Sequence, residues 1–385
     1  MKNYYFILLI VFCLCSCNRH SLNHENLNGA EILSAQFVNS TEPVKRDMLI
    51  DSVSFVKLET ANDCLIGVID KILFVDDIMV VVDKNISKAV YLFDMNGRFL
   101  RQISRLGNGP HEYLTIKDVC ITPNNEIAIY DIFKDKVLFF DTTGQYLKEQ
   151  SMPYRFQQFE YIDSTAIIFN IIGYKEKRKY RNYTYVVTDQ KFKDLYFFGN
   201  ELPDIDFLRN RYVFSYNGTV YCSINFGNTL YQVGKDSIKA AYYLDFPDDV
   251  NKSQYSNTEE YLKLLETHTN FNDGFYELTD YIIYGCIVPY NGMQYFVYDR
   301  KTKESTLLNV REMFNPMLIY MWYLDAVYKD NTVVEIVKST DIIANKESIY
   351  EEFVDDYPQL KDLYDGLNVD SNPVLFFYHI NLKKK

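Results

Sequence analysis

Two stretches of the chain repeat one pattern at an offset of 47 residues: "AVYLFDMNGRFLRQIS" at residues 89–104 and "KVLFFDTTGQYLKEQS" at residues 136–151. Each begins with an apolar run, passes through a polar turn that glycine closes, and ends in a second run. Glycine suits the left-handed position of a three-residue hairpin loop. The pattern therefore predicts a repeated β-hairpin. The matching residues are Val90, Phe93, Asp94, Gly97 and Leu100, paired with Val137, Phe140, Asp141, Gly144 and Leu147.

The repeat continues upstream of both hairpins. "VIDKILFVDDIMVVVD" at residues 68–83 aligns with "TIKDVCITPNNEIAIYD" at residues 115–131 at the same offset, with a one-residue difference in the turn. Each unit thus holds four short strands, a pattern typical of β-propeller blades. The polar turn between the first two strands recurs, which predicts an all-β, six-bladed propeller of four-stranded blades. We find these turns at Asp76-Asp77, Asn124-Asn125, Asp163-Ser164, Asn217-Gly218, Asn291-Gly292 and Asp330-Asn331.

Two short helical insertions interrupt the strands. The Asn-Gly turns at 217–218 and 291–292 lie 74 residues apart, and an insertion at about 247–273 restores the period. It contains "SNTEEYLKLLETH", which a Ser256/Glu259 capping box would open. A second insertion, at about 345–366, would begin at the capping box of Ser348 and Glu351.

Each end of the repeat region has a strand without a partner in sequence. "DSVSFVKLET" at residues 51–60 precedes the first unit, and "PVLFFYHINLKKK" at residues 373–385 ends the chain. We expect the first of these strands to join the last blade and close the ring. The propeller would then span residues 51–385.

The N-terminus resembles that of a bacterial lipoprotein. Residues 4–14, "YYFILLIVFCL", are apolar but shorter than the ~20 residues that cross a bilayer, as in a secretory signal. "LCSC" at residues 14–17 resembles a lipobox, so we expect a signal peptide over 1–16, a lipidated Cys17, and a flexible tether over 17–50. No acidic cluster follows Cys17, which favours the outer membrane of the cell envelope, facing the periplasm.

Charge and cysteine content exclude several classes of protein. The mature chain would carry 39 basic and 52 acidic residues, which argues against binding to nucleic acid. Four cysteines remain beyond the signal, far apart and without a C-x-x-C pair; we interpret them as buried thiols, and the sequence predicts no metal site and no cofactor. They are Cys64, Cys120, Cys222 and Cys286.

The loop "RLGNGPHEYL" at residues 105–114 is the candidate site. It would connect the outer strand of the first blade to the inner strand of the second. It lacks the spacing of a phosphate loop and of H-E-x-x-H, so we interpret its glycines as serving a tight backbone path. Its side chains remain candidates for a ligand face at the channel mouth: Arg105, His111, Glu112 and Tyr113.

The stretch from Gly107 to Gln150 resembles an NHL-type repeat, with a glycine-rich start, an acidic-aromatic pair, and a glycine-closed hairpin. Together with the lipobox, "VKLETANDCLIG" and "NTLYQV…YYLDF", the chain is similar to the six-bladed β-propeller lipoproteins of Bacteroides-type bacteria. The resemblance is clearest in the first two blades. It implies the fold, and it brings no common activity and no catalytic residues.

Two hypotheses of function follow. The first is a membrane-anchored, non-catalytic binding or scaffold propeller, which presents one face to an envelope protein, peptide or glycan. The second is a hydrolase or lyase with its site at the channel mouth. The sequence has no G-x-S-x-G elbow, and His111 is the one histidine placed for a site. These features favour the first hypothesis.

The lipobox generates a prediction about anchoring. Cys17→Ala should leave the chain without lipid and release it into the soluble fraction when envelopes are washed without detergent. Fractionation and immunoblotting measure the result. Retention of the variant on the membrane would contradict the lipoprotein interpretation.

Overall fold

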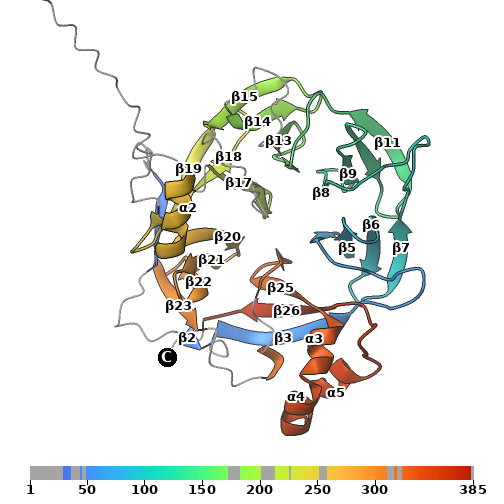
Figure 1. Cartoon of the computed structure of the whole chain (residues 1–385), viewed down its shortest axis with the longest axis vertical. Helices are drawn as coiled ribbons and strands as arrows, with labels where there is room; N and C mark the ends of the chain where they lie inside the picture. Colours follow the sequence, from blue (N-terminus) through green and yellow to red (C-terminus); the bar gives the residue numbers. More distant parts are fainter. Residues whose placement is uncertain are drawn as a thin grey trace, which may run out of the picture.

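In the computed structural model, six small antiparallel sheets stand in a ring around a central axis (Figure 1). The structure describes residues 29–35, 44–45, 49–171, 183–200, 213–224, 227–250, 258–309, 316–318 and 323–382. Each sheet supplies one blade of four strands from the axis outward, and two of the sheets carry a fifth strand at the outer edge. The predicted all-β, six-bladed propeller is therefore confirmed.

The first three blades follow the sequence repeat. Blade 1 contains β4 (Lys71–Val75), β5 (Ile78–Asp83), β6 (Ala89–Asp94) and β7 (Phe99–Ile103). Blade 2 contains β8 (Asp118–Ile121), β9 (Ile127–Asp131), β10 (Lys136–Phe140) and β11 (Tyr146–Ser151). Blade 3 contains β12 (Gln158–Tyr161), β13 (Ala166–Asn170), β14 (Tyr183–Asp189) and β15 (Asp194–Asn200).

The other three blades complete the ring. Blade 4 contains β16 (Val213–Tyr216), β17 (Thr219–Ser223), β18 (Thr229–Val233) and β19 (Ile238–Asp245). Blade 5 contains β20 (Asn270–Glu277), β21 (Tyr281–Val288), β22 (Gly292–Asp299) and β23 (Glu304–Asn309), and a 3-10 turn, η3 (Pro316–Leu318), follows it. Blade 6 contains β24 (Ala326–Val327), β25 (Thr332–Val337), β26 (Val374–Ile380) and β3 (Ile50–Lys57).

The outer hairpins explain the repeat that the sequence displays. The Asp94 carboxylate accepts hydrogen bonds from the backbone N–H of Asn96 and Arg98, both at 2.9 Å, and Gly97 has a φ of 82°. An aspartate that bonds the backbone two residues on defines such a turn. Blade 3 repeats it with Asp189, although Phe192 stands in place of glycine with a φ of 60°.

Blades 1 and 2 each contain a second, buried aspartate that holds the loops of its own blade together. Buried Asp83 accepts hydrogen bonds at 2.9 Å from the N–H of both Gly67 and Ile86, which lie on different loops. Buried Asp131 accepts one from Leu114 at 2.6 Å in the same way. Because a buried carboxylate needs such donors, each aspartate fixes the path by which the chain enters its blade.

The ring closes between the two ends of the repeat region (Figure 1). Strand β3 pairs antiparallel with β26, in a register that runs from Lys57 opposite Val374 to Ile50 opposite Ile380. The predicted closure by the N-terminal strand is thus confirmed. Lys57 also donates hydrogen bonds to the carbonyls of Asp362 and Asp365, which attach the last helical insertion to the closing strand.

The core lies between the blades. Six hydrophobic clusters of described residues each combine side chains from two neighbouring sheets. In the cluster between blades 4 and 5, Phe275 contacts Phe214 and Tyr221 with ring centroids 6.1 and 5.7 Å apart. The aromatic residues therefore hold blade to blade. The cysteines at positions 64, 120, 222 and 286 are free and buried, as expected.

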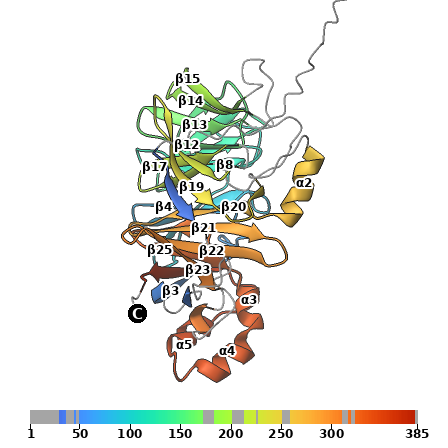
Figure 2. The ribbon, with the colours of Figure 1, turned by 90° about the vertical axis from the view of Figure 1, so that its left-hand side faces the viewer.

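Both helical insertions occur, with corrected bounds. Helix α2 (Thr258–Thr267) stands on one side of the ring (Figure 2), and β20 begins at Asn270, inside the range expected for the insertion. The second insertion holds three helices instead of one: α3 (Ser339–Ala344), α4 (Lys346–Phe353) and α5 (Gln359–Tyr364).

Two sequence assignments are wrong, one in the second insertion and one in blade 5. Ser348 is not a helix cap, because it lies inside α4 and its hydroxyl donates to the carbonyl of Asn345. The Asn291-Gly292 turn joins the second and third strands of blade 5 instead of the first two. Its eight-residue strands resemble an inner hairpin in sequence because an Asn-Gly turn joins two runs that are mostly apolar.

The segment expected to be a tether differs in its described parts. Strand β1 (Glu31–Ser34) pairs in parallel with β19, and β2 (Val44–Lys45) pairs in parallel with β23. Tyr298 and Lys303 of blade 5 both bond to the Glu31 carboxylate. Residues 1–16 and Cys17 lie outside the described residues. No helix in the described part of the chain is long and apolar enough to cross a membrane.

Ring closure generates a prediction about truncation. A chain that begins at Leu58 loses β3 and should lose its cooperative thermal transition, because blade 6 then lacks its outer strand. A chain that begins at Leu49 lacks β1 and β2 but keeps β3, and it should still unfold cooperatively at a reduced melting temperature. Circular dichroism measures both, and equal melting of the two chains would refute closure by β3.

Candidate functional site

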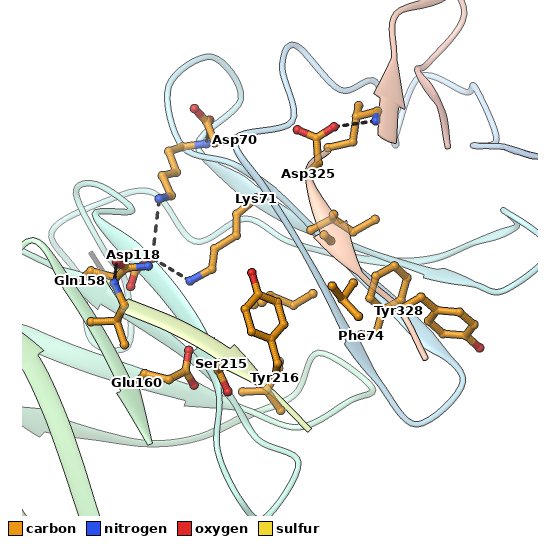
Figure 3. A pocket seen from close by; sticks show the side chains of 18 of the residues that line it. Asp70, Lys71, Phe74, Asp118, Gln158, Glu160, Ser215, Tyr216, Asp325 and Tyr328 are labelled. Atoms are coloured by element: carbon orange, nitrogen blue, oxygen red, sulfur yellow. Dashed lines mark hydrogen bonds and ion pairs between the residues drawn. The ribbon is translucent and has the colours of Figure 1, made fainter. Parts of the chain in front are cut away.

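The inner strands of five blades enclose a pocket of about 490 Å³ along the axis of the ring (Figure 3). This volume lies within the ~300–1,000 Å³ that is usual for small-molecule sites. The wall combines charged, amide, hydroxyl and aromatic side chains. The residues used below are Asp70, Lys71, Phe74, Lys84, Lys117, Asp118, Gln158, Glu160, Ser215, Tyr216, Asp325 and Tyr328.

A network of charges crosses from blade 1 to blade 2. The Lys71 ammonium lies 3.1 Å from Oδ1 of Asp118 and donates to the carbonyl of Val119 at 2.6 Å. The Lys84 ammonium lies 3.6 Å from the same oxygen. The other oxygen of Asp118 accepts the backbone N–H of Phe159 at 3.2 Å. Two blade interfaces therefore meet at one carboxylate, whose side chain is only 3% exposed.

The repeat explains why these charges meet. Lys71 and Asp118 are 47 residues apart, so they occupy equivalent positions on neighbouring inner strands. The pair "DK" at residues 70–71 becomes "KD" at residues 117–118. Neighbouring blades thus place opposite charges side by side around the axis.

Burial and neighbouring charges shift the pKa of two lysines in opposite directions. Burial alone would lower the pKa of Lys71, but Asp118 and Glu160 outweigh it, and the pKa lies above its ordinary value. The pKa of Lys117 is lowered, first by burial and then by the charge of Lys84. Lys71 is therefore a satisfied cation, whereas the environment of Lys117 disfavours its charge.

The far end of the pocket is aromatic. Phe74 of blade 1 and Tyr328, which follows the inner strand of blade 6, have ring centroids 4.8 Å apart and lie together in Figure 3. Buried Tyr216 of blade 4 lines the wall between them and the charges. The pocket therefore has a charged end and an aromatic end.

The loop singled out from the sequence connects β7 to β8 as expected, but its side chains do not line this pocket. The His111 ring packs on Tyr146 of outer strand β11, with centroids 4.0 Å apart, and its Nδ1 lies 3.8 Å from Glu149. The Arg105 guanidinium carbon lies 5.9 Å from the ring centre of Phe140. Both side chains lie over the outer strands of blade 2.

The other two predicted residues hold the loop together. Tyr113 is fully buried, and its hydroxyl donates to the carbonyls of Lys88 and Ile103 at 2.8 and 3.1 Å. Glu112 accepts the N–H of Gly109 at 2.6 Å. A Cβ at Gly107 would come within 2.1 Å of the Glu112 carboxylate, so a side chain there would displace this carboxylate from the N–H of Gly109.

The sequence analysis did not identify the side chains that line the pocket, because they belong to no catalytic motif. The signal that would have found them is the exchange of "DK" for "KD" at the repeat offset. Among the described residues, no group of three or more His, Cys, Asp or Glu side chains has the arrangement of a metal site. None of the three described histidines, at 111, 268 and 379, lines the pocket.

Comparison with known proteins places the chain by family and fold. A family model described as "Domain of unknown function (DUF4934)" matches residues 31–379. A Bacteroides fragilis protein named as a candidate exported protein is 21% identical, with a TM-score of 0.72 over 91% of this chain and 99% of that one. A DUF4221 member from Bacteroides vulgatus is 10% identical, with a TM-score of 0.53 over 90% and 99%.

The remaining comparisons bring no activity to this chain. A virginiamycin B lyase from Staphylococcus aureus has a TM-score of 0.39, with 12% identity, over 68% of this chain and 76% of that one. At that score the likeness supports no transfer of chemistry. No curated protein matches the sequence.

The charge network generates a prediction about stability. Asp118→Asn leaves Lys71 and Lys84 without their shared carboxylate, and removing one partner of a buried pair costs about 3–5 kcal/mol. We expect the lower end, because Lys71 is 19% exposed and Glu160 also acts on it. Urea unfolding measures the change.

The matched control for this prediction is Asp77→Asn. Asp77 pairs with Lys329 at 3.8 Å and is 90% exposed, so its loss should stay within about 0.5 kcal/mol. Equal effects of the two substitutions would show that the network does not hold the blades together.

Proposed function

This chain belongs to the DUF4934 family, and we propose that it is a non-catalytic binding propeller that receives a polar ligand in its central pocket. The ligand is a small molecule or a protruding group of an envelope protein, peptide or glycan. We further propose that the chain is exported and held by lipid on Cys17, in the outer membrane facing the periplasm. The lipobox-like "LCSC" supports this location.

The observation that carries the proposal is the charged wall of an otherwise well-packed ring. Burying charge costs free energy, and apolar side chains of similar size would hold two strands together as well or better. Blades 1 and 2 nevertheless place Lys71, Lys84 and Asp118 on the pocket wall. Such an arrangement is favoured where the charges contact a ligand.

The geometry favours binding over the alternative of a hydrolase or lyase. A general base must be free to take a proton from the substrate. Asp118 instead meets two ammonium groups and a backbone N–H. This arrangement fixes the charge in place, as a recognition surface requires.

The proposal predicts that a side chain that fills the pocket blocks the ligand. Native mass spectrometry of the chain purified from its own envelope should detect a bound small molecule or fragment. Ser215→Trp on inner strand β16 should remove that added mass, because Ser215 lines the pocket. Ser151→Trp on outer strand β11 introduces the same ring at an exposed position and should retain it. Equal occupancy in both variants, or an empty wild-type pocket, would overturn the proposal.

A further inference from the structure

Lys117 is a lysine of the pocket wall that has no ion-pair partner in the described part of the chain. It immediately precedes β8, and its backbone N–H donates to the carbonyl of Tyr130 at 2.8 Å. Its side chain is half-buried and lines the pocket. Among the described residues, no acidic side chain forms an ion pair with its ammonium, because the neighbouring Asp118 is engaged by Lys71 and Lys84. An unpaired, partly desolvated ammonium is costly in a folded protein.

The charge balance of this wall differs from that of the whole chain. The wall of blades 1 and 2 carries three lysines and two aspartates, whereas the rest of the pocket lining adds two acids, Glu160 and Asp325, so that the whole lining holds three lysines and four acids. The whole chain has a net charge of −12. The lysines are therefore confined to the side of the pocket on which Lys117 lies, and the lining as a whole is acidic.

We infer that Lys117, with Lys84 beside it, binds the carboxylate of a small polar ligand in the central pocket. This inference rests on the proposed function and specifies its ligand. Because the whole lining holds one more acid than base, it repels a phosphate monoester, which carries about −1.5 to −2, more strongly than a carboxylate with its single charge. A carboxylate also accepts the hydrogen bonds that ammonium groups donate.

The remaining wall suits a ligand rich in hydroxyl or amide groups. Gln158 of β12 and Ser215 of β16 border the pocket, and the aromatic end lies beyond them. A sugar acid and a short peptide with a free carboxylate share this chemistry. The shared element is the carboxylate at Lys117, and the probes below distinguish the two sources.

The full-length chain is titrated by calorimetry with four probes: galacturonate, neutral galactose, N-acetyl-diglycine and inorganic phosphate. We expect at least one carboxylate probe to bind the wild type, and galactose to bind at least about tenfold more weakly than galacturonate if the sugar acid is the ligand. Lys117→Gln should weaken the carboxylate probe by roughly 10–100-fold, since a hydrogen bond to a charged group is worth that much. The control, Lys239→Gln on the exposed face of β19, should bind like the wild type.

A stability measurement separates recognition from structure. Because the charge of Lys117 is disfavoured by its surroundings, Lys117→Gln should melt at or above the wild-type temperature while it loses the ligand. A drop as large as that of Asp118→Asn would assign Lys117 a structural role and overturn the inference. Equal binding by wild type and Lys117→Gln would also overturn it.

Two further outcomes would contradict the inference of a carboxylate ligand but would not contradict the proposed function. Phosphate binding more tightly than every carboxylate probe would show that the ligand class is wrong. Binding of neither carboxylate probe at millimolar concentration would show the same. In both cases the mass added in the native protein, and its loss in Ser215→Trp, would remain.

Discussion

The antiparallel ladder between β3 and β26 is the constraint on which the ring depends. Blade 6 draws three strands from the end of the repeat region and its outer strand from the beginning. Without the pairing of β3 with β26, no strand would link the first blade to the last one. Because residues 58–70 lead directly from β3 to Lys71 at the start of β4, closure also fixes where the pocket wall of blade 1 begins. The aromatic pair of Phe74 and Tyr328 lies at the same seam, so closure completes both ends of the pocket.

The repeat both builds the scaffold and allows it to vary at the axis. Asp83 and Asp131 do the same structural task one unit apart, as do the hairpin aspartates of blades 1, 2 and 3. At the innermost positions the same offset exchanges acid for base, so that Lys71 meets Asp118. Residues that are identical from one blade to the next at the turns maintain the fold. Residues that differ between blades at the axis give the pocket its chemistry.

How far the sequence predicts this structure varies along the chain. The blade count, the four-strand unit and the closure follow from the glycine-closed hairpins and the unpaired terminal strands. In blade 5 the Asn291-Gly292 turn was assigned to the wrong strand pair, because an Asn-Gly turn predicts a hairpin but does not show which two strands of the blade it joins. His111 was a candidate site residue because of its residue type, but the fold shows that it packs on Tyr146 of an outer strand. The pocket depends on contacts between blades, which no single motif encodes.

Strand β1 has a consequence for assembly between molecules. An outermost strand with unpaired N–H and C=O groups is a template on which another chain can add. In blade 4 this edge is paired along the four residues of β1, and in blade 5 the strand β2 pairs with Leu308 and Asn309 at the end of β23. By pairing with these edges, β1 and β2 hinder the addition of a strand from a neighbouring copy of the chain. A proteolytic cut between residues 45 and 49 would separate both strands from the ring and allow both edges to be exposed, while β3 keeps the ring closed.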